Sequence, residues 1–267
     1  MLLAGARSGS DLRHRRADRA TGDRIVLPRP VRLPVDALAT LLRHARIGEL
    51  PEVLAPVAVW RHHDEAQAAQ ASAYEEAKRL GWLDSRGQLD VDVAAALSVL
   101  CRANVEYYGW VARQRSILAA ATGRKAILAI RDGAEISLRK TKASKLAEAL
   151  VEQLPDMHPG SGTPVSVSVD ELRAATKKQK PARPDLRQVL QVMAQPSTGS
   201  GELWVAVRDS LGRRTEITHP LRYADTAWGR FLNLATVSSG GDLWLTVAPA
   251  SPSDLVTRLR SLERALG

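Results

Sequence analysis

Cysteine is nearly absent from this chain: its 267 residues include one, Cys101. A single cysteine excludes an internal disulfide framework and any zinc cluster built from several thiolates of one chain. The sequence also has no run of about eighteen apolar residues, and its first apolar residues are interrupted by Gly5 and Arg7. We therefore expect neither a membrane-spanning segment nor a signal peptide, and we predict a cytoplasmic protein.

Motifs for catalysis or cofactor binding are missing as well. The His-His-Asp-Glu run at residues 62–65 places its histidines side by side, whereas zinc ligands on one helix lie three or four residues apart. Residues 122–125 resemble a shortened phosphate loop that lacks the first glycine and the hydroxyl residue. His158, His219 and Cys101 have no sequence neighbours that would mark them as a base or nucleophile. We predict no catalytic residue, no cofactor and no metal; an enzyme is the least favoured class.

Positive charge is in excess, because 38 Lys and Arg residues against 29 Asp and Glu give a net charge of +9. Residues 1–24 hold six arginines against three aspartates and, after Leu3, few large apolar side chains, so we predict a disordered basic tail. This tail and the basic residues 177–180 leave a nucleic-acid-binding protein as an alternative function. The other basic residues are scattered and do not alternate with aromatic ones, which makes nucleic acid the less favoured partner.

The clearest local pattern is an antiparallel meander at residues 201–249. Residues 203–209 alternate between apolar and polar faces, as a half-buried strand does. Turns at residues 209–212, 225–229 and 238–242 each contain glycine, and such short connections join antiparallel neighbours. The stretch therefore predicts four strands that fold back on one another.

Helices and further strands surround this meander. Apolar spacing predicts helices at about 35–47, 64–80, 90–102, 143–154 and 185–194, and strands at 56–60, 105–118, 125–139 and 165–169. Two prolines limit residues 25–33 to an edge strand. Ser251 followed by Pro252 predicts the start of a final helix.

The two halves of the chain repeat the same order of strand, helix, helix, strands and helix. The matched positions are Pro34 with Ser168, Trp110 with Trp204, Ile136 with Leu245, and Leu150 with Leu259. The match between the two tryptophans favours a structural role for both. The first half carries an extra helical insert at about residues 48–90.

This repeat predicts one continuous, mostly antiparallel central β-sheet with helices beside it, an α+β fold arranged about an internal pseudo-two-fold axis. We expect residues 25–267 to form a single domain. Its halves would be about residues 25–155 and 163–267.

Several motifs closely resemble the EspG family, which belongs to the type VII (ESX) secretion systems of actinobacteria. The C-terminal half carries WVAVRDSLGRR, HPLRYADTAWGRF and GGDLWLTVAPASPSDLVTRLRSL in that order. The N-terminal half is similar too: a helix is followed by GELP at residues 48–51 and by a long alanine-rich helix ending in LGWLD at residues 80–84. The resemblance spans about residues 25–266.

This resemblance implies an α+β fold with two helical subdomains and the function of a cytosolic chaperone. Such a protein binds the exposed apolar tip of a PE/PPE-type heterodimer, keeps it soluble and directs it to the secretion machinery. It needs no cofactor and does not insert into a membrane. The expected partner is a PE/PPE-like or another small helical secreted protein, and the free chain is expected to be a monomer or a homodimer.

In the family, a long loop between two strands and a helical subdomain contribute to the client surface. In this chain the corresponding loop would be residues 118–125, although it is short for a client-binding arm. The helix at residues 185–194 is expected to contribute more weakly to the client surface. The candidate contacts are Leu118, Thr122, Gly123, Arg124 and Lys125 in the loop and Gln188 and Val192 on the helix.

Overall fold

The computed structural model describes residues 30–60, 62–111, 115–178 and 183–267. The predicted tail at residues 1–24 lies outside this range. The described elements, in chain order, are β1 (Val31–Pro34), α1 (Val35–His44), α2 (His63–Arg79), α3 (Val91–Arg102), β2 (Val105–Trp110), β3 (Arg115–Thr122), β4 (Lys125–Asp132), β5 (Glu135–Lys140), the 3-10 helix η1 (Ala143–Lys145), α4 (Leu146–Val151), β6 (Val165–Ser168), α5 (Val169–Lys178), α6 (Pro184–Met193), β7 (Ser197–Arg208), β8 (Arg214–Glu216), β9 (Leu221–Thr226), β10 (Gly229–Val237), β11 (Leu243–Pro249) and α7 (Pro252–Leu266).

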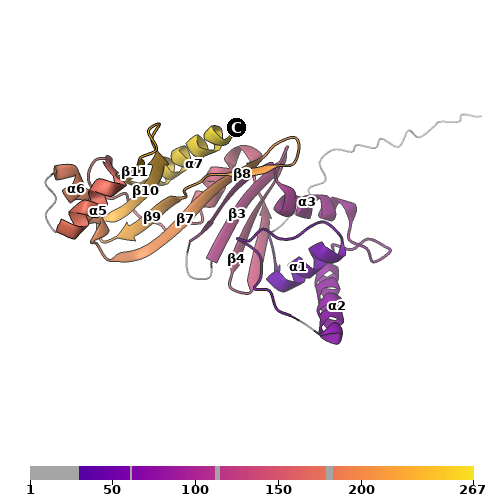
Figure 1. The fold of residues 1–267 in the computed structure, drawn as a ribbon. Coiled ribbons are helices and arrows are strands. Elements are labelled where there is room, and N and C mark those ends of the chain that lie inside the picture. Colours follow the sequence, from indigo (N-terminus) through magenta and orange to yellow (C-terminus); the bar gives the residue numbers. More distant parts are fainter. Residues whose placement is uncertain (1–29, 61, 112–114, 179–182) are drawn as a thin grey trace, which may run out of the picture.

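These strands form one continuous sheet (Figure 1). Its order is β1-β5-β4-β3-β2-β7-β9-β10-β11-β6, with β8 paired to β7 alone. All of these strand pairings are antiparallel. The predicted α+β class with a central antiparallel sheet is thereby confirmed.

The same elements follow each other outward from the central pair β2 and β7 on both sides of the sheet. Positions matched in the sequence occupy corresponding places: Pro34 pairs with Glu135 at one edge, and Ser168 pairs with Trp244 at the other. The two-fold relation itself stays a prediction. So does the division into one domain with two halves.

A glycine allows the two central strands to approach. Gly109 of β2 lies opposite Leu203 of β7, and a Cβ added to it would overlap the carbonyl oxygen of Glu202. Glycine is therefore required at this position for steric reasons.

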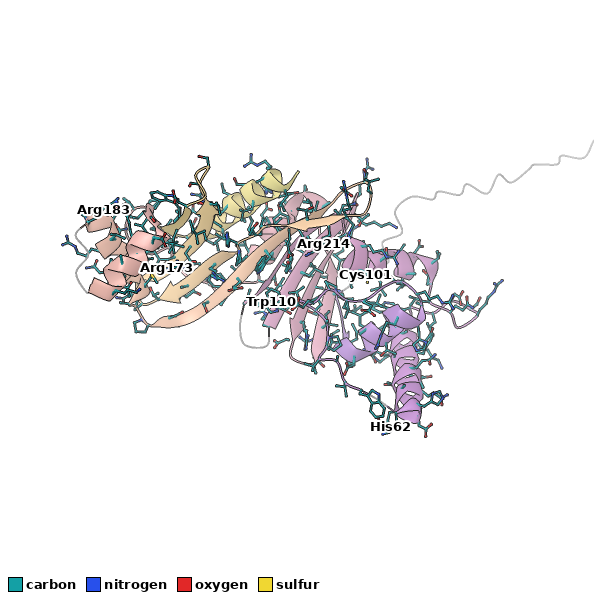
Figure 2. All side chains as sticks on the ribbon, viewed as in Figure 1. His62, Cys101, Trp110, Arg173, Arg183 and Arg214 are labelled. Carbon is teal, nitrogen blue, oxygen red and sulfur yellow. The ribbon has the colours of Figure 1, made fainter. Side chains whose placement is uncertain are left out.

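Helices cover the two faces of the sheet differently. On one face, which we call the α3 face, α1, α2 and α3 lie over one end and α5 and α6 over the other (Figure 1). Arg173 and Arg183 mark α5 and the start of α6 in Figure 2, at the opposite end from His62 before α2. The other face, the α7 face, is covered by α4 and α7.

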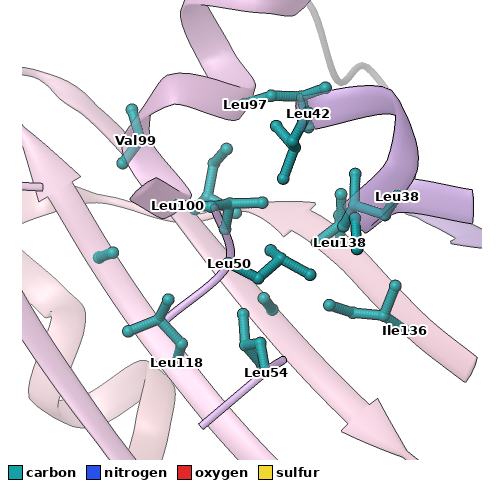
Figure 3. Close-up of a cluster of buried hydrophobic side chains, with 14 of the residues drawn as sticks. Leu38, Leu42, Leu50, Leu54, Leu97, Val99, Leu100, Leu118, Ile136 and Leu138 are labelled. Carbon is teal, nitrogen blue, oxygen red and sulfur yellow. The ribbon is translucent and has the colours of Figure 1, made fainter. Parts of the chain in front are cut away.

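Alternate strand residues supply a core on each face. On the α3 face, Leu118 and Ile136 of the sheet pack with Leu38 and Leu100 of the helices (Figure 3). On the α7 face, strand residues pack against Leu255 and Leu259 of α7. Burial of these apolar side chains is the main driving force for assembling the layers.

The last helix begins as its sequence predicts. Ser251 accepts a hydrogen bond from the Asp254 backbone N–H, and the Asp254 carboxylate accepts one from the Ser251 backbone N–H. This reciprocal capping satisfies two N–H groups that the helix itself leaves unpaired.

A buried ion pair joins the β9–β10 hairpin to residues 155–160, the segment that the sequence predicts between two halves. The Arg230 guanidinium donates from Nε and Nη2 to the two carboxylate oxygens of Asp225, at 2.6 and 2.8 Å, and from Nη2 to the Pro155 carbonyl at 2.8 Å. Its backbone also bonds to His158 and Gly160. Residues 155–160 are thus held against the turn between β9 and β10.

Three local expectations were wrong. Residues 56–60 form no strand, because they run beyond the sheet with Val57 and Trp60 exposed. Residues 105–118 are not continuous: β2 ends at Trp110, and β3 begins at Arg115. The meander has a fifth strand, β8, which is three residues long.

Candidate functional site

The segment expected to be a client-binding loop is mostly strand. Leu118 lies inside β3 with no exposed surface, and only Gly123 and Arg124 connect β3 to β4. The loop expected at residues 118–125 is therefore wrong. The alanines that follow Leu118 are small enough to be buried on both faces, so they give no alternating pattern that identifies a strand.

The other expected contacts lie in two distant places. Thr122 and Lys125 pair across the exposed hairpin turn. On α6, Gln188 donates a hydrogen bond to the Thr163 carbonyl, and Val192 is half-buried against the local core. α6 packs on β6, which is separated from β4 by six strands of the sheet, so the fold does not bring these two sets together.

Between the two helical layers, the described residues leave part of the α3 face open. Among the described residues, no helix of this face packs closely on β7 or β9, and Figure 1 shows these strands between α5–α6 and α1–α3. Cross-strand neighbours form a row over this area: Trp110, Glu202, Arg222 and Asn233. We call this area, together with Trp204 beside it, the open strip.

Aromatic side chains line the end of the open strip nearest α3. Trp204 stacks on Tyr108, its direct neighbour across β2 and β7, with ring centroids 6.4 Å apart and 12° between the planes. Trp110 meets Tyr108 edge-on at 5.9 Å and is 39% exposed. The structural role predicted for Trp110 stays a prediction, and its exposed ring surface is also accessible to a partner.

A charged network borders these aromatic rings. The buried Glu106 carboxylate accepts from Arg214 Nε at 3.0 Å and lies 3.7 Å from Arg208 Nη2. Arg214 Nη1 also donates to Glu216 at 2.8 Å, and the Tyr108 hydroxyl donates to the same carboxylate at 2.5 Å. The network thus holds the Tyr108 ring through its hydroxyl group and through Arg214, which lies over the ring.

The pKa values of two of these groups reflect this network. Burial and the hydrogen bond to Glu216 raise the pKa of Tyr108 to about 12. For Glu216, partial burial opposes ionisation, but the hydrogen bonds from Tyr108 and Arg214 outweigh it and lower the pKa. At neutral pH the tyrosine is therefore a hydrogen-bond donor and the glutamate a charged acceptor.

A pocket of about 450 Å³ opens where these groups meet. Its floor comes from β2, β7 and β8, and its wall from residues 49–53 and from Cys101 of α3. Figure 2 places Trp110, Arg214 and Cys101 around this central region. Burial raises the pKa of the Cys101 thiol to about 11, so this residue is a poor nucleophile at neutral pH.

The residue types around this pocket are those of a binding surface. In the described part of the chain, no three His, Cys, Asp or Glu side chains gather as metal ligands would. None of the described helices is both long and apolar enough to cross a membrane. Trp, Tyr and Arg are the residues that contribute most at protein interfaces, and all three occur here.

The fold and this surface define a protein with one extended antiparallel sheet, helical layers at both ends and an open strip between them. The EspG family model matches residues 34–261, and the chain belongs to that family. A search of curated proteins gave no match.

The fold is similar to that of the Mycobacterium tuberculosis type VII secretion system chaperone EspG5, solved in complex with a PE25-PPE41 dimer. The TM-score is 0.67 at 16% sequence identity, and the match covers 90% of this chain and 97% of the solved chain.

Proposed function

We propose that this protein is a cytoplasmic chaperone of a PE/PPE-like heterodimer destined for type VII secretion. The observation that carries the proposal is membership of the EspG family, which the family model supports over residues 34–261. The fold adds support, because the similar EspG5 chaperone was solved with a PE25-PPE41 dimer bound. The protein acts by binding and has no catalytic step.

The open strip is the surface that we assign to the client. A chaperone of this kind has to cover apolar side chains at a helical tip, and an interface of that sort combines an aromatic centre with a polar rim. Trp110 and Trp204 supply the aromatic centre, and the Glu202–Arg222 ion pair at 2.7 Å supplies part of the rim.

The helical layer at the far end of the strip contributes flanking contacts through Gln188 and Val192 of α6. The exposed turn with Thr122, Gly123, Arg124 and Lys125 forms a separate candidate contact. Leu118 does not contact the client, because its side chain has no exposed surface.

Binding stabilises the client by mass action. A partner that recognises only the folded client lowers the concentration of free, aggregation-prone tips in proportion to its affinity and concentration. No cofactor or chemical energy is required for this step. Release then depends on a competing partner at the secretion machinery.

Co-expression with a cognate PE/PPE-like pair, followed by size-exclusion chromatography, tests the proposal. We expect a stable complex of one chaperone with one heterodimer. Trp110→Ala should weaken it at least about tenfold, as truncation of an interface tryptophan does. The matched control is Trp228→Ala, which removes a tryptophan of similar exposure, 45%, from the β9–β10 turn outside the strip.

The proposal fails if no cognate pair forms a complex with the wild-type chain. If Trp110→Ala and Trp228→Ala weaken client binding equally, the chaperone function is still supported, but the open strip is not the client-binding site. Substitution of Lys125 by Ala measures the contribution of the turn in the same assay.

A further inference from the structure

The pocket at the end of the open strip has the opposite charge to the protein as a whole. The chain carries a net charge of +9. Four glutamates and two arginines line the pocket, which gives it a net formal charge of −2; they are Glu49, Glu52, Glu106, Glu216, Arg208 and Arg214. A locally acidic site on a basic protein selects for a cation.

The two arginines are already engaged. Arg214 bonds to Glu106 and Glu216, and Arg208 lies within ion-pair distance of Glu106. On the wall, Glu49 and Glu52 are exposed and form no ion pair within the described part of the chain. Two carboxylates at the mouth are therefore available to an incoming positive charge.

An unpaired donor lies on the floor of the same pocket. Trp204 lines the pocket, and its indole Nε1–H is buried with no hydrogen-bond partner. A buried N–H without an acceptor is unfavourable by about 1–3 kcal/mol; because this atom has almost no accessible surface, a ligand carbonyl gains from pairing with it only when the indole ring turns toward the cavity. The nearby Tyr108 ring already faces Arg214 at 5.5 Å, while Trp110 keeps free surface.

We propose that this pocket receives a lysine or arginine side chain from the helical tip of the client. The positive head lies between Glu49 and Glu52, and its aliphatic stem packs on Trp110. A turn of the Trp204 indole ring toward the cavity then allows a client main-chain carbonyl to accept from its Nε1. A cavity of about 450 Å³ holds the volume of about fifteen water molecules, which is sufficient for one long side chain with its adjoining backbone. The inference rests on the proposed function and adds the chemistry of the client residue.

A short peptide tests the pocket without knowledge of the client. The probe is acetyl-Leu-Arg-Leu-amide, and its neutral match carries citrulline in place of arginine. Titration into the full-length protein is followed by the ¹⁵N indole signals, with those of Trp110 and Trp204 assigned from Trp→Phe variants. We expect both signals to shift, and the arginine peptide to bind about fivefold more tightly than the citrulline peptide at low salt.

Charge removal at the mouth should abolish this preference. Glu49→Gln/Glu52→Gln is expected to weaken the arginine peptide about fivefold and to leave the citrulline peptide unchanged. The control variant, Glu75→Gln/Glu152→Gln, removes the same charge from exposed positions that do not line the pocket and should change neither. Equal affinity for the two peptides, or shifts that spare Trp204, would overturn the proposal.

The arginine-rich residues 1–24 of the chain itself are the competing occupant. Changing Arg13, Arg15, Arg16 and Arg19 to Gln in the full chain tests this directly. If these residues fill the pocket, the variant shifts the Trp204 indole signal without peptide and binds the peptide more tightly, which contradicts the client assignment. An unchanged spectrum supports it.

The client complex separates this inference from the proposed function. If the wild-type chain and Glu49→Gln/Glu52→Gln form the complex equally well, the chaperone function holds and the basic-residue pocket is refuted. If the wild-type chain forms no complex, the function fails while the peptide titration still decides whether the pocket binds a cation. If only Glu49→Gln/Glu52→Gln binds the client about fivefold more weakly than the wild-type chain, both the chaperone function and the basic-residue pocket are supported.

Discussion

The buried Asp225–Arg230 pair predicts a large loss of stability when one partner is removed. Both side chains are almost completely buried, at 3% and 2% exposure, and Arg230 makes three charge-assisted hydrogen bonds between 2.6 and 2.8 Å. Arg230→Met leaves the Asp225 carboxylate buried without its counterion. Such a change destabilises proteins by about 3–5 kcal/mol.

Urea unfolding followed by tryptophan fluorescence measures this loss. With a slope of about 3 kcal/mol/M, a loss of 4 kcal/mol lowers the midpoint by roughly 1.3 M. The control is Arg213→Met, because Arg213 is 75% exposed in its pair with Asp209, and exposed pairs contribute about 0–1 kcal/mol.

The double variant Asp225→Leu/Arg230→Met separates two explanations. If an uncompensated charge causes the loss, removing both charges should restore much of the stability, although the Pro155 carbonyl still lacks its donor. Additive losses from the two single substitutions would refute this reasoning. If Arg230→Met lowers the free energy of unfolding by less than about 1 kcal/mol, the ion pair does not hold residues 155–160 in place.

Three further results are expected. Gly109→Ala should destabilise the fold by about 1–3 kcal/mol in the same assay, because the new Cβ overlaps a carbonyl of β7; a neutral effect would contradict the close approach. In an absorbance titration, Tyr108 and Tyr223, whose burial raises both pKa values to about 12, should ionise only near that pH. Because the pKa is raised in the folded state, their contribution to stability is complete below about pH 10 and is lost as the pH rises to about 12; ionisation of all four tyrosines near pH 10 would contradict it. Cys101, whose pKa burial raises to about 11, should react with iodoacetamide at pH 8 on the order of a hundredfold more slowly than an unfolded thiol with a pKa of about 8.5, a difference that urea should remove.

The sequence predicts elements well where a physical signal is local. Glycine-bearing turns at residues 209–212, 225–229 and 238–242 define the hairpins of the second half, and the Ser251 cap defines the start of α7. Strand order also follows from short connections, because neighbours joined by tight turns have to pair. These signals were sufficient for the fold class.

The site depends on pairings that no local pattern contains. Tyr108 meets Trp204 only because β2 and β7 are neighbours, and those strands are separated by almost a hundred residues of chain. Likewise, Glu106 and Arg214 become partners only when the β7–β8 hairpin lies beside β2. The sequence could therefore supply the residue types of the network but could not place them together.

The pocket occurs at one end of the open strip because residues 49–53 line it there, and these residues lie in the predicted insert at about residues 48–90. Glu49, Pro51, Glu52 and Val53 form its wall, and all four lie in this insert. Between the matched elements β6–α5 and α6, the second half has only a short connection and no counterpart of α2 among its described residues. If the halves descend from one unit, the insert made them different, because it added an acidic wall beside the central strands of the first half alone. Exchange of Glu49, Pro51 and Glu52 for serine, which keeps the buried Leu50 and Val53, should then remove the peptide preference for arginine, while the indole signals of the sheet residues still report a folded protein.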